Sequence, residues 1–214
     1  MNTRDYKTFA PGEYYHVFNR GVGKMDIFKD EQDYNNFQKR LDIVLGHTKP
    51  RLNYGGPGME RIQIKSLDKG SFDLVAYCLM PNHYHFLIKQ NGDVPISTFI
   101  SKLFTSYSMY FNKKYNRVGT LFQDIFKSVL VDDNEQLLWL SAYIHQNPVV
   151  AGVTWDLNQW KWSSYGQYLG GEGVSNPGII LEQFKDLKGY QKFVDSSFDL
   201  IVKKKQSDKD IFLD

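Results

Sequence analysis

Alternating apolar and polar positions along the chain predict a set of short β-strands rich in aromatic and β-branched residues. Successive side chains of a strand point to opposite faces of a sheet, so this alternation is typical of strands. Residues 68–70 separate two of the runs and indicate a hairpin. Residues 80–82 mark a corner, because Pro81 cannot donate a hydrogen bond to a neighbouring strand. The predicted strands are residues 12–20, 61–66, 72–80, 83–89 and 125–131.

Other stretches repeat their apolar positions every three or four residues, which is the period of an amphipathic helix. Asp132 and Asp133 can cap the start of one of these helices. We expect that helix to end near Gln146, because the residue before Pro148 disfavours helical backbone angles. The other predicted helices are residues 30–45, 95–114 and 181–198.

The order of these elements favours an α+β sandwich of the ferredoxin-like (RRM-like) kind, in which an antiparallel sheet carries helices on one face. The chain has no internal repeat, and its 214 residues suit one large domain with a small appendage. We place the domain at residues 1–170, with the Trp- and Tyr-rich residues 155–169 packing back onto it. Residues 171–214 form a C-terminal extension, predicted to be one helix followed by a polar tail.

Composition limits the classes of protein that remain. Hydrophobic residues make up 42% of the chain and charged residues 23%, which is ordinary for a globular protein. The net charge is only +2, so any nucleic-acid surface must come from local placement of cations. The single cysteine, Cys78, excludes an intramolecular disulfide and a four-cysteine zinc site. No apolar run suggests a membrane span or a secretory signal, so we expect a cytoplasmic protein with no membrane partner.

Two histidines on one predicted strand form the first candidate site. His83 and His85 point to the same face of the strand, and Tyr84 points to the other. Two neutral imidazoles side by side form half of a divalent-metal site, which then needs a third ligand. A pair of strand histidines hydrogen-bonded at a sheet edge explains the pattern without a metal. We interpret His16, on the first strand, as a buried or edge residue.

The second candidate site lies at the end of a predicted helix. Tyr143 and Asn147 are four residues apart and share one helix face, just before Pro148. A phenol can act as a nucleophile toward phosphorus, but its ordinary pKa of about 10 means that it needs a base or a polarised electrophile. We expect the Tyr143 hydroxyl to be partly exposed. The alternative is a core aromatic followed by an ordinary helix-end asparagine.

Taken together, these segments resemble the single-tyrosine HUH transposases, in particular the IS200-like and REP-associated tyrosine transposases, which are linked to repetitive extragenic palindromes. The resemblance covers most of residues 12–170, in the order and at the spacing of that family, and no family motif follows residue 170. It rests on YYHVFNRG at 14–21, CLMPNHYHFLI at 78–88, NRVGTLFQDIFKS at 116–128, YIHQNPVVAG at 143–152 and WKWSSYGQYLG at 160–170.

The resemblance implies roles for four residues. His83 and His85 match the family's metal-binding pair, Tyr143 its nucleophile, and Asn147 the side chain that completes the metal site. Residues 1–170 would then form an HUH single-tyrosine transposase domain that uses divalent Mg²⁺ or Mn²⁺, although ligand type alone also allows Zn²⁺. The implied reaction is cleavage and rejoining of single-stranded or hairpin-forming DNA through a 5′-phosphotyrosine, with no need for ATP.

Three cations are candidates for DNA contact. Arg20 lies beside Gly21 and Gly23, where a cation next to a pliable backbone suits a phosphate, although a simple turn explains these residues as well. Lys127 resembles a basic position of the family. Arg117 follows a predicted helix, and positive charge is favoured near a helix C-terminus without any DNA. We expect the DNA partner to be associated with repeats.

Two other functions stay open at this point. One is a non-catalytic, domesticated nucleic-acid-binding module on the same fold, and the other is a metal-dependent hydrolase in which water attacks and Tyr143 is structural. We favour the strand-transferring enzyme, since a binding module has no need for the phenol together with its three companions. The sequence does not distinguish a monomer from a homodimer, or say whether Tyr143 serves the histidines of its own chain.

Overall fold

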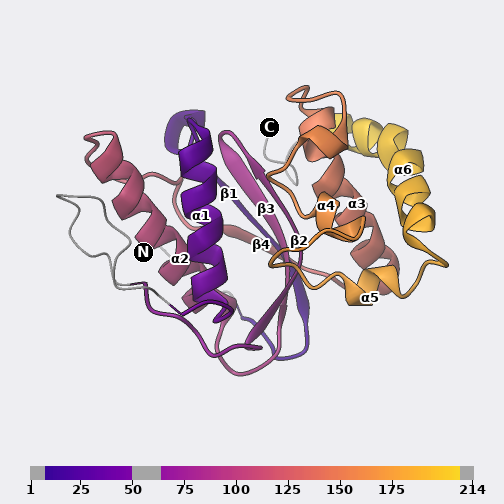
Figure 1. Cartoon of the computed structure of the whole chain (residues 1–214), viewed down its shortest axis with the longest axis horizontal. Coiled ribbons are helices and arrows are strands. Elements are labelled where there is room, and N and C mark those ends of the chain that lie inside the picture. Colours follow the sequence, from indigo (N-terminus) through magenta and orange to yellow (C-terminus); the bar gives the residue numbers. More distant parts are fainter. Residues whose placement is uncertain (1–7, 50–63, 208–214) are drawn as a thin grey trace.

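Four antiparallel strands form the single sheet of the computed structural model, which describes residues 8–49 and 64–207 (Figure 1). The strand order across the sheet is β2-β3-β1-β4. This arrangement confirms the predicted α+β sandwich with an antiparallel sheet. The strands are β1 (Tyr14–Arg20), β2 (Phe72–Met80), β3 (His83–Gln90) and β4 (Lys127–Leu130).

Helices surround the sheet, and the predicted helical segments are confirmed with shifted ends. None of the helices in the described part of the chain is long and apolar enough to cross a membrane. The predicted cap is also found, since the Asp133 side chain accepts a hydrogen bond from the backbone N–H of Gln136. The helices are α1 (Glu31–Val44), α2 (Ile96–Lys114), α3 (Asn134–Val150), α4 (Tyr165–Tyr168), α5 (Gly178–Leu181) and α6 (Leu187–Ser207).

Both faces of the sheet are covered, whereas the sequence suggested helices on one face. On β3, Tyr84 and Phe86 belong to the core beneath α1 and α2, and Leu87 belongs to a second core beneath α3. In Figure 1, α1 and α2 lie on one side of the sheet, and α3 and α6 lie on the other. The reason is visible in β2 and β3, which are buried along almost their whole length and therefore need cover on both sides.

One predicted strand is wrong. Of residues 61–66, the last three are irregular, and the first three lie outside the described residues. The Leu67 N–H instead donates a hydrogen bond to the carbonyl of Val44 at the end of α1. β2 therefore pairs with β3 rather than with a preceding strand, and the corner at residues 81–82 is the turn between them.

The predicted end of α3 is also wrong, because the helix continues through Pro148 to Val150. Proline removes the hydrogen bond that its own N–H would donate, and its ring crowds the carbonyl four residues earlier. Packing of α3 against β2, β3 and α6 holds the helix together in spite of this cost. Bonding is present again at Ala151, whose N–H lies 2.9 Å from the carbonyl oxygen of Asn147. Asn147 is therefore held inside a regular helix rather than at a fraying end.

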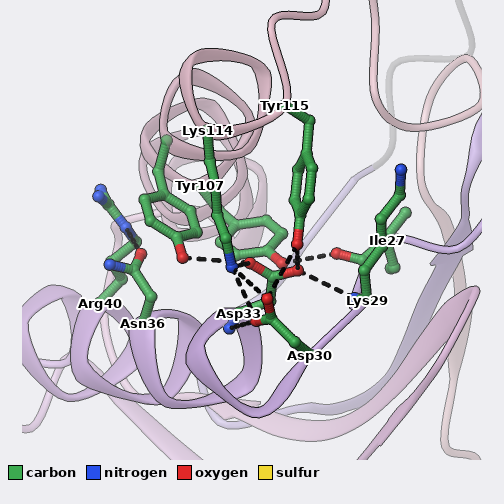
Figure 2. A network of polar contacts seen from close by, with 10 residues as sticks. Ile27, Lys29, Asp30, Asp33, Asn36, Arg40, Tyr107, Lys114 and Tyr115 are labelled. Carbon is green, nitrogen blue, oxygen red and sulfur yellow. Dashed lines mark hydrogen bonds and ion pairs between the residues drawn. The ribbon is translucent and has the colours of Figure 1, made fainter.

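A buried carboxylate joins α1 to α2 (Figure 2). Asp33 is fully buried on α1 and accepts hydrogen bonds at 2.7 Å from Lys114 Nζ, 3.1 Å from Tyr110 Oη and 2.8 Å from Tyr115 Oη. The backbone N–H of Lys29 donates a fourth hydrogen bond at 2.9 Å. A charge out of contact with water needs such partners, so this cluster fixes how the two helices pack.

We expect Lys114→Met to lower the free energy of unfolding by about 3 kcal/mol, because it leaves the buried Asp33 carboxylate without its cation. Urea unfolding followed by circular dichroism measures the change. Lys39→Met, at an exposed position of α1, is the control and should shift the free energy by less than about 0.5 kcal/mol. Equal effects of the two substitutions would contradict this account of the helix pair.

Candidate metal and nucleophile site

Two adjacent strands bring three buried histidines to the face of the sheet that α3 covers. His83 and His85 on β3 have ring centroids 5.1 Å apart, with ring planes at 89°. His16 on β1 places its Nε2 atom 2.9 Å from Nδ1 of His85. Each of the three residues is less than a tenth exposed. Burial lowers the pKa of His16 to about 3, so this imidazole is neutral at pH 7.

One turn of α3 lays two more polar side chains against these histidines. Asn147 Oδ1 lies 3.4 Å from His83 Nε2. The Tyr143 ring lies 5.5 Å from the His85 ring and 6.0 Å from the His16 ring, in edge-on contact with both. The structure therefore brings together the four residues that the two sequence patterns singled out, and it adds His16, which the sequence analysis treated only as a buried or edge residue.

The hydrogen bonds of His83 leave its Nε2 atom facing another acceptor. Nδ1 lies 2.6 Å from Asn82 Oδ1, which can only accept, so Nδ1 carries the proton and donates it. The neutral ring then has a lone pair on Nε2, which faces the oxygen of Asn147. Two lone pairs facing each other repel, and a cation held by both atoms would offset this repulsion.

The amide group of Asn147 supports the same interpretation. Its Nδ2 atom is buried and makes no hydrogen bond to any described residue, although the residue is only 1% exposed. An unsatisfied buried amide costs about 1–3 kcal/mol and is typical of functional sites. No three His, Cys, Asp or Glu residues cluster as a metal site within residues 8–49 and 64–207. Two imidazoles with an amide oxygen as third ligand fit a divalent cation such as Mn²⁺.

The Tyr143 side chain is buried, which corrects the expectation of a partly exposed hydroxyl. The residue is 1% exposed. Trp139, one turn earlier on α3, stacks on it with ring centroids 5.3 Å apart and ring planes at 9°. Lys204 of α6 lies over Trp139, with Nζ 4.4 Å from the ring centroid. The sequence analysis did not connect α6 with this site.

Two of the three candidate DNA-binding cations border the histidine face. Arg20 lies directly opposite His83 in the β1–β3 pair, so both belong to one face of the sheet. Lys127 is exposed on β4, opposite Phe18, with its Nζ atom 6.0 Å from the Phe18 ring centroid. Gly21 is required by the turn itself, because a Cβ atom there would lie 2.1 Å from the carbonyl oxygen of Met25.

Arg117 takes part in a different set of contacts. Its guanidinium donates hydrogen bonds to Asn112 Oδ1 at 3.0 Å and to the carbonyl of Thr120 at 3.3 Å. These bonds fix the loop that follows α2, which explains the residue without DNA. Its role as a DNA contact stays a prediction.

His145 is a fully buried residue of α3. Its two ring nitrogens lie 2.8 Å from Tyr190 Oη and 2.7 Å from Ser164 Oγ. Burial lowers the pKa of His145 to about 3, so the ring is neutral. The contacts tie α3 to α6 and to the segment before α4, so His145 acts in the fold rather than in the site.

Comparisons with known proteins agree with this fold. Residues 55–147 match the family model described as "Transposase IS200 like". No curated protein sequence matches the chain significantly. A solved REP-associated tyrosine transposase bound to a REP hairpin shares the fold at 14% identity and a TM-score of 0.57, over 83% of this chain and 93% of that one. A candidate transposase from Deinococcus radiodurans R1 aligns at 13% identity and a TM-score of 0.40, over 63% and 91%.

The family match and the shared fold confirm the resemblance drawn from the sequence. Residues 55–147 are similar to the IS200-like transposase family. Among solved structures its fold is similar to that of the REP-associated tyrosine transposase.

Proposed function

We propose that the protein is a metal-dependent DNA strand transferase, which cleaves and rejoins single-stranded or hairpin-forming DNA with Tyr143 as the nucleophile. The observation that carries the proposal is the meeting of Tyr143 and Asn147 on α3 with His83 and His85 on β3. The match of residues 55–147 to a transposase family model supports DNA as the substrate. The similar fold of a transposase bound to a REP hairpin supports a hairpin-forming, repeat-associated DNA partner.

In this proposal His83, His85 and Asn147 hold one divalent cation, Mg²⁺ or Mn²⁺, through two imidazole nitrogens and an amide oxygen. All three ligands are neutral, so a bound cation would keep its full double charge and polarise a scissile phosphate. Asn82 holds the proton of His83 on Nδ1, which keeps Nε2 free of a proton for this role.

Tyr143 then performs the covalent step. Its phenol oxygen attacks phosphorus, the new O–P bond forms, and the bond from phosphorus to the 3′ oxygen breaks. The phenol loses its proton and the leaving 3′ oxygen gains one, which gives a 5′-phosphotyrosine and a free 3′-hydroxyl. One phosphodiester replaces another, so the step is close to thermoneutral and can run backward to rejoin the strand without ATP.

Arg20 and Lys127 act as phosphate contacts around this centre. The Arg20 guanidinium extends from the position next to His83, where a fixed positive charge offsets charge on the scissile phosphate. Lys127 lies on the edge strand and is exposed, so it suits a neighbouring phosphate of the same strand.

We infer further that Tyr143 serves the histidines of its own chain. α3 packs against β2 and β3 of the same molecule, and the Tyr143 ring contacts His85 there. A second copy is not needed to complete the site.

The domain boundary at residue 170 and the cytoplasmic location of the protein stay predictions.

A non-catalytic nucleic-acid-binding module is the second candidate. The burial of Tyr143 favours it, because a nucleophile must reach its phosphate and this ring is 1% exposed. The two functions differ in one product, a covalent bond between the protein and DNA.

We expect calorimetric titration of Mn²⁺ to give one site per chain, with affinity at least about tenfold weaker in His83→Ala, because one of only three protein ligands is lost. His47→Ala is the matched control, since His47 lies just beyond α1 and pairs with Asp42. It should bind Mn²⁺ as the wild type does. Equal affinity of His83→Ala and the wild type would remove the metal site from the proposal.

We expect binding of a hairpin DNA with a single-stranded flank to weaken steeply as salt rises, since each phosphate contact releases counterions. In Arg20→Gln/Lys127→Gln the slope of log affinity against log salt should fall by about 1–2. Fluorescence anisotropy over a salt series measures it. Lys161→Gln is the control, an exposed lysine paired with Glu31, and should keep the wild-type slope. A wild-type slope in the double variant would contradict the proposal that Arg20 and Lys127 contact DNA phosphates.

We expect Tyr143→Phe to abolish the covalent DNA–protein adduct that migrates slowly on a denaturing gel, because the attacking oxygen is gone. Folding, Mn²⁺ binding and DNA binding should persist, since the ring still packs. Tyr115→Phe is the matched control, because its hydroxyl binds Asp33 in the other core. An adduct that survives in Tyr143→Phe would show that another residue attacks.

A further inference from the structure

We propose that His16 is a positioning residue for His85. It accepts a hydrogen bond from the Nδ1–H group of His85 and so leaves the Nε2 atom of His85 to bind the cation. The inference rests on the proposed metal site, and it adds a residue that does not itself contact the cation.

Packing holds the His16 ring in place for this contact. On β1, the residue directly opposite His85 is Phe18, and His16 lies opposite Leu87, so its ring reaches diagonally to His85. The His16 and Phe18 rings stack with centroids 4.7 Å apart. The His16 and His85 rings have centroids 5.1 Å apart and planes at 19°. Residue 16 is 3% exposed, so water does not compete for the bond.

The distance of 2.9 Å between His16 Nε2 and His85 Nδ1 admits two proton arrangements. A hydrogen bond between two neutral imidazoles needs one donor and one acceptor. If His16 donates, the proton of the neutral His85 ring sits on Nε2, and that atom cannot bind a cation. If His85 donates, its Nε2 carries a lone pair. Only the second arrangement is compatible with a metal ligand at His85.

His83, the other proposed ligand on β3, also uses Nδ1 for a hydrogen bond to the protein, but its partner is Asn82. Asn82 Oδ1 accepts from Nδ1 of His83, as His16 Nε2 does from Nδ1 of His85. Both ligand rings thus use Nδ1 for a protein contact and keep Nε2 for the cation. Such outer contacts fix the tautomer and the orientation of metal-binding histidines, and their loss typically weakens metal affinity about 10–100-fold.

The first test measures Mn²⁺ affinity by calorimetry in two substitutions at this position. His16→Phe keeps a ring against Phe18 but has no acceptor, and we expect about 10–100-fold weaker binding. His16→Gln offers an oxygen near the former Nε2 position, and we expect it to restore most of the affinity. Tyr107→Phe is the control for general destabilisation, because this buried hydroxyl donates to the carbonyl of Ile27 in the other core, and the variant should bind Mn²⁺ normally. Thermal unfolding checks that each variant is folded.

The second test needs no substitution at residue 16. Nitrogen-15 NMR of histidine-labelled, metal-free wild type reports which ring nitrogen of His85 carries the proton, and His85→Gln identifies the signals. We expect the proton on Nδ1. A proton on Nε2 would overturn the inference even if every His16 variant failed to fold.

The outcomes separate this inference from the proposed function. If the wild type binds no Mn²⁺, or if His83→Ala binds it as tightly as the wild type, the proposed metal site is wrong. The proposed role of His16 is then wrong as well. If the wild type binds, His83→Ala loses affinity and His16→Phe binds like the wild type, only the role of His16 is overturned. Equal losses in His16→Phe and His16→Gln would indicate that His16 is itself a ligand and would overturn the positioning role.

Discussion

The packing of α3 against the central strands is the constraint on which the rest of the site depends. The sheet buries one side of this helix, and α6 covers another. His145 fastens it from behind through Ser164 and Tyr190, so the helix cannot turn without breaking buried hydrogen bonds. Because α3 is fixed in this way, Tyr143 and Asn147 have fixed positions over the histidines of β3. Burial also keeps water out, which strengthens the electrostatic effect of any bound cation.

The placement of the two residue pairs could be predicted from the strand and helix periods of the sequence. The two-residue period of a strand places His83 and His85 on one face, and the helical period places Tyr143 and Asn147 on one face. Each pattern is confirmed by the register of β3 and by the course of α3. The same reasoning failed at Pro148, where tertiary packing holds a helix that the local preference would end. The hairpin assigned before β2 failed because residues 64–66 are irregular and Leu67 bonds to the end of α1 instead of to the sheet.

Long-range contacts could not be read from the sequence. Nothing in the pattern around His16 points to His85, because the two residues are 69 positions apart and meet only through the pairing of β1 with β3. The burial of Tyr143 depends on Trp139 and on Lys204 of α6, a helix beyond the last family motif. These contacts arise from packing between distant segments, and composition or periodicity does not encode which segments meet.

The most direct test of the central claim is to map the residue that becomes linked to DNA. The protein is incubated with Mn²⁺ and a hairpin DNA with a single-stranded flank, denatured, digested with trypsin and examined by mass spectrometry. Cleavage after Lys127 and Lys161 releases residues 128–161, in which Tyr143 is the only tyrosine. The account predicts that this peptide carries a 5′-phosphate-linked DNA fragment. DNA attached to a different peptide, or no attachment although the same DNA binds, would contradict it.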